Sequence, residues 1–166
     1  LETLARVRTV VFDKTGTLTE GSFTVTAVHP EIIPETALLE TAALAESYSD
    51  HPVAASLRRA YARPLDKSRV SDMENFAGEG IRAKVDGHEV YAGNEKLMHR
   101  AGVVPNPCEC KGTIIHLAPD GSYAGHIVIS DTVKPQSSAA IARLKSEGIE
   151  KVVMLTGDRP DVAEKV

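Results

Sequence analysis

The hydrophobic positions of this chain follow one period near its two ends and another in its middle. Residues 7–12 (V-R-T-V-V-F) and 149–155 (I-E-K-V-V-M-L) are short runs rich in β-branched residues, which are typical of buried strands in a parallel sheet. A helix is predicted over residues 135–147, with Gly148 as its left-handed stop, and another from Pro160. Because a strand–helix–strand order implies a right-handed crossover, we expect the two runs to be parallel neighbours in one sheet.

The middle of the chain alternates with a period of two instead. Residues 80–92 turn back at Asp86-Gly87, which is a strong hairpin signal, and a second strand pair is predicted around the turn at 119–121. These strands indicate an antiparallel sheet with helices beside it. The helices are predicted over residues 34–47, from Pro52 onward with Ser49 or Asp50 near the cap, and over residues 94–101.

The predicted fold class is therefore α/β, a Rossmann-like parallel-sheet domain that is interrupted by an inserted α+β domain. We assign residues 1–23 and 127–166 to the α/β domain and residues 24–126 to the insertion. The chain opens on Leu1, and its pattern stops within the helix that begins at Pro160. We therefore expect a piece of a longer protein, whose α/β domain is truncated at its C-terminus.

Composition narrows the classes of function. The 166 residues carry a formal net charge of −4 without a block of like charge, which argues against a nucleic-acid-binding surface. No apolar run approaches the ~18 residues that a membrane-spanning helix needs, and no signal-peptide pattern opens the chain. The two cysteines, Cys108 and Cys110, are too few for a disulfide framework, so we expect a reducing, cytosolic environment.

The same two cysteines are compatible with a soft metal ion, because two thiolates stand one residue apart in P-C-E-C-K-G. Closing a four-ligand site requires further partners, and the sequence suggests none beyond His99 or His116. We therefore expect this segment to be a solvated loop.

The first apolar run ends on an aspartate. Asp13 lies at the carboxyl end of a predicted parallel strand, where open α/β sheets bind their ligands, and Thr156-Gly157-Asp158 follows the second run in the same way. A carboxylate can attack phosphorus and form an aspartyl-phosphate. Phosphoryl transfer then depends chiefly on neutralising charge, for which Lys14 offers a cation and Thr156 a hydroxyl. The plainer alternative is a polar loop after a strand.

Position 15 separates two kinds of phosphoryl chemistry. An acidic group two residues after the nucleophile could activate water and make a phosphatase, whereas Thr15 does not ionise at neutral pH. An acyl-phosphate on Asp13 should therefore survive long enough to be used for something else.

The string D-K-T-G-T-L-T, from Asp13 to Thr19, resembles the phosphorylation signature of P-type ATPases, which belong to the haloacid dehalogenase-like superfamily. The insertion is similar to the nucleotide-binding domain of the heavy-metal-transporting (type IB) members, since it contains E-S-Y-S-D-H-P, A-G-E-G-I and Y-A-G-N. The segment S-D-T-V-K-P resembles the hinge of that family, with Asp131 and Lys134 as its polar pair.

The resemblance assigns two sets of site residues. The catalytic set is Asp13, Lys14, Thr15, Thr156, Gly157 and Asp158. The adenine and ribose site falls on Glu46, His51, Gly78, Gly80, Ile81, Gly93 and Asn94. Each element of the second set also has a purely structural interpretation: His-Pro can begin a helix, the glycines can form a tight turn, and Asn94 can cap a helix.

The resemblance implies the cytosolic ATP-binding and phosphorylation region of a heavy-metal-exporting pump in the cell membrane. ATP bound by the inserted domain would pass its γ-phosphate to Asp13. The implied cofactor is Mg²⁺, held in part by Asp13 and the Thr15 carbonyl. The implied partners are the membrane helices and actuator domain of the same pump, together with the transported metal ion. The segments "AESYSDHPVAASL" and "YAGNEKLM" look more like the zinc/cadmium/lead group than the copper group.

A later acidic stretch that supplies magnesium ligands in the family lies outside this sequence, so we expect ATP binding with little or no turnover. Two alternatives from other classes remain open at this point. The first is a haloacid dehalogenase-like phosphatase with a cap domain, and the second is a stand-alone nucleotide-binding regulator.

Overall fold

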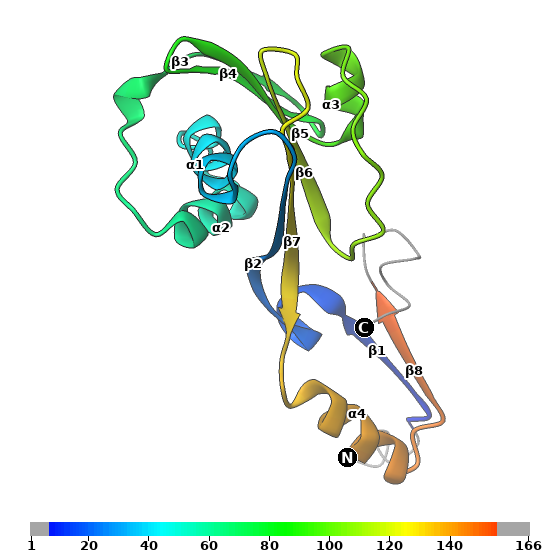
Figure 1. Cartoon of the computed structure of the whole chain (residues 1–166). Coiled ribbons are helices and arrows are strands. Elements are labelled where there is room, and N and C mark those ends of the chain that lie inside the picture. The colour runs from blue at the N-terminus through cyan, green and yellow to red at the C-terminus, as the bar shows by residue number, and fades with distance from the viewer. Residues whose placement is uncertain (1–6, 156–166) are drawn as a thin grey trace. The chain divides into compact units, whose positions relative to one another are not determined.

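A computed structural model describes residues 7–155 of the chain, apart from the side chain of Thr15 (Figure 1). The chain forms two compact units, one made of Leu1–Ser22 with Asp131–Val166 and the other of Phe23–Ser130. None of the helices within residues 7–155 combines the length and the apolar character that crossing a bilayer requires. The helix predicted from Pro160 lies outside the described residues.

The first unit contains a parallel strand pair. Strand β1 (Thr9–Asp13) pairs in parallel with β8 (Lys151–Leu155), which confirms the predicted pairing of the two apolar runs. Helix α4 (Ser137–Ser146) precedes β8, and its chain reverses at Gly148, where φ is +99°. The expectation of fully buried strands is wrong here: Val11 is 52% exposed. Within the described residues this sheet has two strands, so β1 alternates between half-buried and exposed positions.

The second unit is built on a six-stranded sheet with the order β2-β7-β6-β5-β4-β3. The pairs from β7 through β3 are antiparallel, and β4 turns into β5 at Asp86-Gly87, as the sequence predicts. Strands β2 and β3 were not predicted. The strands are β2 (Thr19–Pro30), β3 (Val70–Phe76), β4 (Gly80–Val85), β5 (His88–Gly93), β6 (Thr113–Pro119) and β7 (Gly125–Val133).

Two of these strands continue across the division between the units. Strand β2 begins at Thr19, and β7 continues as one strand to Val133, whereas the units divide at Ser22/Phe23 and Ser130/Asp131. The expected boundary at 126/127 therefore falls inside β7. Periodicity in the sequence cannot reveal this, because a strand that changes its packing partners keeps its own period of two.

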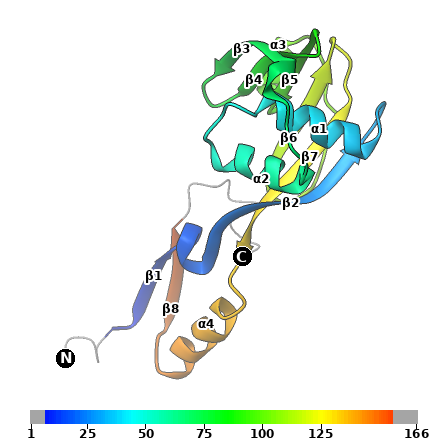
Figure 2. The ribbon, with the colours of Figure 1, turned by 90° about the vertical axis from the view of Figure 1, so that its left-hand side faces the viewer.

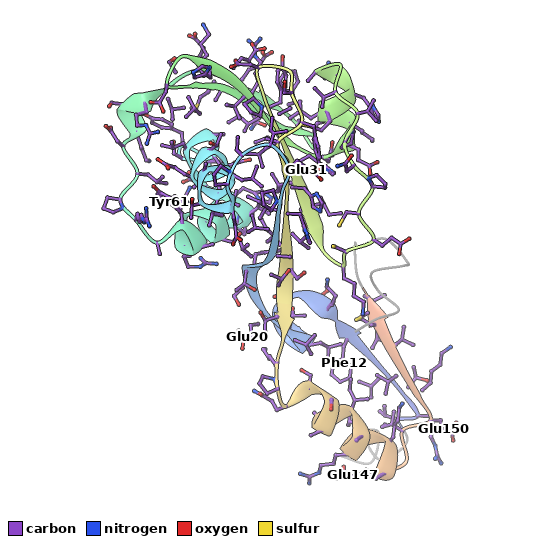
Figure 3. All side chains as sticks on the ribbon, in the orientation of Figure 1. Phe12, Glu20, Glu31, Tyr61, Glu147 and Glu150 are labelled. Carbon is purple, nitrogen blue, oxygen red and sulfur yellow. The ribbon has the colours of Figure 1, made fainter. Side chains whose placement is uncertain are left out.

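Helices cover both faces of the large sheet. Helices α1 (Glu35–Ala45) and α2 (Pro52–Tyr61) lie on one face, and the short α3 (Glu95–Arg100) lies on the other (Figures 1 and 2). Along β5, Val90 and Ala92 belong to the larger core, while Tyr91 packs with the smaller cluster around α3. Side chains fill the space between α1, α2 and the sheet, with Tyr61 packed at the edge of this core (Figure 3).

Strands β4 and β5 approach each other unusually closely where Gly80 pairs with Gly93. A Cβ added to Gly93 would lie 2.2 Å from the Glu79 carbonyl oxygen and 2.9 Å from the Gly80 Cα. A Cβ on Gly80 would lie 2.3 Å from the Ala92 carbonyl oxygen, and its φ of +139° is itself unfavourable for other residues. Backbone atoms cannot move aside as a flexible side chain does, so this contact requires two glycines.

We expect Gly93→Ala to destabilise the fold by about 1–3 kcal/mol, because the added methyl group overpacks a contact between two backbones. Urea unfolding of the variant measures this loss. The matched control is Gly87→Asn at the hairpin tip: an added Cβ meets nothing within 4 Å there, and asparagine tolerates the positive φ of +83°. Its cost should be smaller than that of Gly93→Ala, because only the strain of a positive φ remains there. Equal losses in both variants would contradict the close-contact explanation.

Candidate functional site

Asp13 is the last residue of β1, and its register partner in β8 is Leu155. Its side chain is exposed, in an extended backbone position. A single π-helical turn, Lys14–Leu18, follows at once, and Gly16 supplies the positive φ of +78° that this tight turn contains. Lys14 itself is buried, at 8% exposure. The carboxylate is thus presented to solvent on a sharply turned segment, as a nucleophile requires.

The loop after Asp13 is anchored by the two residues predicted as a hinge. The Thr19 hydroxyl donates to the Asp131 carboxylate and accepts from the backbone N–H of Gly16 at 3.2 Å. The Lys134 ammonium donates to the Gly16 carbonyl oxygen at 2.8 Å. Asp131 lies within β7 rather than in a flexible connection. The pair therefore holds the loop after Asp13 in place from the neighbouring chain segment.

Other members of the predicted catalytic set cannot be placed. Thr156, Gly157 and Asp158 lie outside the described residues, although Leu155, directly before them, pairs with Asp13. The backbone of Thr15 is part of the π-helical turn. Among the described residues, Asp13 does not belong to a group of three or more acidic, histidine or cysteine side chains. This fits at most part of a magnesium site, since Mg²⁺ prefers six oxygen ligands and takes several of them from water and phosphate.

All seven residues of the predicted nucleotide set line one pocket of about 360 Å³ in the second unit. They come from four places in the sequence: the end of α1, the start of α2, the β3–β4 turn and the β5–α3 junction. The seven are Glu46, His51, Gly78, Gly80, Ile81, Gly93 and Asn94.

His51 has a structural task as well as a place in the pocket. Pro52 occupies the first turn of α2 as predicted, but the N-cap is His51, not Ser49 or Asp50. The His51 Nδ1 accepts from the backbone N–H of Val53 at 3.2 Å. Because an accepting Nδ1 carries no hydrogen, the neutral ring has its proton on Nε2. His51 therefore presents an N–H donor and an aromatic face.

Glu46 is held at the end of α1 beside this ring. The Arg58 guanidinium donates to the carbonyl oxygens of Glu46 and Ser49, at 3.2 and 3.0 Å, and so fixes the turn between the helices. Burial raises the pKa of the Glu46 carboxyl, against smaller opposite effects of Ser49, His51 and Arg58. A partly desolvated carboxylate of this kind gains from an N–H donor on a ligand.

Asn94 and the glycines act through the backbone. The Asn94 side chain caps α3 by accepting from Lys96 and Leu97, and it donates to the Gly78 carbonyl oxygen at 2.9 Å. Its amide is therefore engaged within the protein, and Asn94 positions the 78–80 turn. Gly78 has a φ of +73° with open space where a Cβ would point. Gly80 and Gly93 serve the strand contact described above, so of these glycines only Gly78 leaves room for a ligand.

The structure adds lining residues that the sequence motifs did not indicate. Apolar walls come from Val53, Phe76 and Ile114, and Thr113 adds a hydroxyl. The carboxylates of the lining are Glu46 and Glu79, and Arg100 pairs with Glu79 at 3.1 Å, which lowers the pKa of Glu79. The lining residues include neither lysine nor arginine. The pocket therefore suits a flat, uncharged group with N–H donors better than an anionic one.

A larger hollow of about 500 Å³ lies over β3, β4 and β5. Its charged side chains pair with one another: Arg82 contacts Glu74 and Glu89, and Lys84 contacts Asp72. None of the predicted site residues lines it. The smaller pocket, on which the predicted residues converge, is therefore the stronger candidate for a nucleotide site.

Comparison with known proteins gives a consistent result. Residues 7–166 match the family model described as haloacid dehalogenase-like hydrolase. The chain is 50% identical to a zinc-transporting ATPase of Synechocystis sp. strain PCC 6803 and 48% identical to a cadmium, zinc and cobalt-transporting ATPase of Bacillus subtilis. Both matches cover 100% of this chain but only 23% and 24% of those proteins, so the chain spans about a quarter of their length.

Solved structures give the same result. The crystal structure of a zinc-transporting PIB-type ATPase in the E2·Pi state is 31% identical, with a TM-score of 0.75. The match covers 98% of this chain and 28% of that one.

We expect Thr19→Val to cost about 1–3 kcal/mol of stability, because it removes the hydroxyl that bonds the half-buried Asp131 carboxylate and the Gly16 N–H while keeping the shape of the side chain. Chemical denaturation measures the loss. Thr26→Val in the same strand is the control, since it removes only a 3.3 Å hydrogen bond at an exposed position and should cost below about 0.5 kcal/mol. A Thr19 variant as stable as the control would show that the hydroxyl does not anchor the loop.

Proposed function

Because the chain belongs to the haloacid dehalogenase-like hydrolases, and among them to the heavy-metal P-type ATPases, we propose that it binds ATP and accepts its γ-phosphate within a pump for zinc-class cations. In this proposal the unit around Asp13 is the phosphorylation domain and the unit around the 360 Å³ pocket is the nucleotide-binding domain. Both are placed on the cytoplasmic side of the membrane, where ATP is available.

The observation that carries the proposal is the convergence of seven dispersed residues on one pocket whose lining contains neither lysine nor arginine. An adenine ring is flat, apolar on its faces and bears an exocyclic amine. The amine matches the Glu46 carboxylate, the ring matches the His51 imidazole and the apolar walls, and the ribose has room beside Gly78. The lining contains no cation, so we place the phosphates outside the pocket.

The chemical step belongs to Asp13. A carboxylate oxygen of Asp13 attacks the γ-phosphorus, the bond from that phosphorus to the β,γ-bridging oxygen breaks, and ADP leaves with the bond's electron pair. Gly16 gives the loop a shape in which backbone N–H groups can approach the transferred group. Magnesium that arrives with the nucleotide would neutralise phosphate charge, with Asp13 and the Thr15 carbonyl as the ligands this part of the chain offers.

Two features favour transport over simple hydrolysis. Thr15 stands where a phosphatase would need an acid, so the aspartyl-phosphate is expected to persist. Relatives named as zinc or as cadmium, zinc and cobalt transporters are 50% and 48% identical to this chain, whereas a relative named as a copper exporter is 37% identical, which supports a zinc-class cargo over copper and argues against a phosphatase or a free-standing regulator. The membrane helices, the actuator domain and the metal path would be supplied by the rest of the pump.

Calorimetric titration with a non-hydrolysable ATP analogue tests the binding half of the proposal. His51→Asn retains a good helix cap but removes the ring, so it should weaken binding several-fold, which corresponds to about 1 kcal/mol. Asp13→Asn removes a negative charge from the other unit, so affinity should hold or rise slightly. If Asp13→Asn abolishes binding while His51→Asn keeps it, the assignment of the adenine site is wrong.

The chemical half needs the intact pump. We expect Asp13→Asn to abolish the acid-stable phosphoenzyme that forms from labelled ATP, because an amide cannot form the acyl-phosphate. Asp120→Asn, at an exposed turn of the second unit, is the control and should leave labelling unchanged. Phosphoenzyme that persists in the Asp13 variant would place the nucleophile elsewhere.

A further inference from the structure

Three potential metal ligands converge on the face of the large sheet opposite α1 and α2. One ligand atom from each of His29, Cys110 and His126 lies within 4.8 Å of the other two. His29 is near the end of β2 and His126 is in the neighbouring strand β7, while Cys110 belongs to the segment between α3 and β6. Their strand neighbours Val28 and Ile127 pack in the α1/α2 core, so the histidines project from the other face.

The individual contacts are close to those of a coordination sphere. The His29 Nε2 is 3.7 Å from the Cys110 Sγ, and the rings of His29 and His126 stack with their centroids 4.7 Å apart. In a tetrahedral zinc site, nitrogen and sulfur ligands are about 3.3–3.8 Å from one another. His29 and Cys110 are both exposed, so small rotations of these two side chains suffice to close the remaining gaps.

His126 supplies independent evidence for a ligand. It is only 6% exposed, and its Nε2 is buried without a hydrogen-bond partner among the described residues. Buried polar atoms are normally paired, so an unpaired imidazole nitrogen beside a thiol and a second imidazole needs an explanation. A cation bound to this lone pair provides one.

A hydrogen-bonded chain behind His126 controls which nitrogen is available. The Tyr123 hydroxyl lies 3.0 Å from the Nδ1 of His126 and 3.0 Å from the Nδ1 of His116. A hydroxyl has one hydrogen, so it donates to one of these nitrogens and accepts from the other. When the His126 Nδ1 donates, its Nε2 carries a lone pair. Metal-binding histidines typically donate their second nitrogen to an oxygen in this way.

Charge at the site is also compatible with a cation. Burial, and secondarily the proximity of His29, lowers the pKa of the His126 ring. The carboxylate of Glu31, just after β2 (Figure 3), accepts a hydrogen bond from Asn106 at 2.7 Å and so ties the cysteine-containing segment to this end of the sheet. A hydrogen bond with Cys108 raises the pKa of the Cys110 thiol. A metal ion that binds the Cys110 sulfur must therefore displace the thiol proton.

We propose that His29, Cys110 and His126 form a binding site for a zinc-class divalent cation. Imidazole and thiolate together favour Zn²⁺ or Cd²⁺ and do not suit Mg²⁺. The proposal departs from the expectation of a solvated loop, and the histidines that lie near Cys110 are His29 and His126, not His99 or His116. The bound ion would fasten the loop before β6 to strands β2 and β7. The inference does not rest on the proposed ATPase function.

Titration of the metal-free, reduced 166-residue chain with Zn²⁺ against a chromophoric chelator tests the site. We expect one ion per chain, unaffected by excess Mg²⁺, and binding of Co²⁺ should give the intense near-ultraviolet absorption of a cobalt–thiolate bond. His29→Gln and Cys110→Ser should each weaken Zn²⁺ binding at least about tenfold, and Cys110→Ser should remove the absorption. Both residues are exposed, so neither substitution threatens the fold.

His99→Gln provides the matched control, because His99 is an exposed histidine in α3 outside the cluster. The Zn²⁺ affinity of this variant should equal that of the unmodified chain. Zn²⁺ should also raise the thermal midpoint of the unmodified chain and of His99→Gln, but not that of Cys110→Ser. The proposal is overturned if the chain binds no stoichiometric Zn²⁺, or if His29→Gln and Cys110→Ser bind it as tightly as His99→Gln.

Discussion

The candidate nucleotide pocket depends on two backbones that come closer than side chains allow. At Gly80 and Gly93, strands β4 and β5 meet with no room for a Cβ on either residue. This contact brings the 78–80 turn against the start of α3, where Asn94 then binds the Gly78 carbonyl and fixes the turn. The pocket wall on this side is therefore made of main chain. A main-chain wall changes shape less than one built from rotatable side chains, and it requires glycines for a steric reason that exists without any ligand.

In the proposed function, the two units divide the work in a way that follows from their chemistry. Asp13 is an exposed carboxylate, and a second acidic pocket close to it would repel the phosphates it must receive. The pocket in the other unit carries its own carboxylates, Glu46 and Glu79, and is suited to the uncharged end of a nucleotide. Separation onto two units keeps the carboxylates that would recognise the base apart from the carboxylate that would receive the phosphate. The anchoring of the Asp13 loop by Thr19, Asp131 and Lys134 uses residues at the strand ends that connect the two units.

Much of this could be predicted from the sequence, and the failures have physical causes. The parallel pairing of β1 with β8 follows from two apolar runs and a crossover, and the Asp86-Gly87 hairpin follows from turn chemistry. The N-cap of α2 was predicted at Ser49 or Asp50, which are commoner cap residues. In the structure the N-cap is His51, whose ring nitrogen accepts from the Val53 N–H. The convergence of His29 and His126 on Cys110 could not be predicted, because it depends on β2 and β7 being neighbours, and β2 was not recognised as a strand.

The lack of lysine and arginine in the pocket lining has a consequence for the proposed reaction cycle. A site that holds adenine and ribose but makes no contact through a lysine or arginine gains little from the number of phosphates on its ligand. It would hold ADP nearly as well as ATP, so loss of the γ-phosphate alone would not expel the product. In the proposed pump, exchange of ADP for ATP would then follow the relative abundance of the two nucleotides.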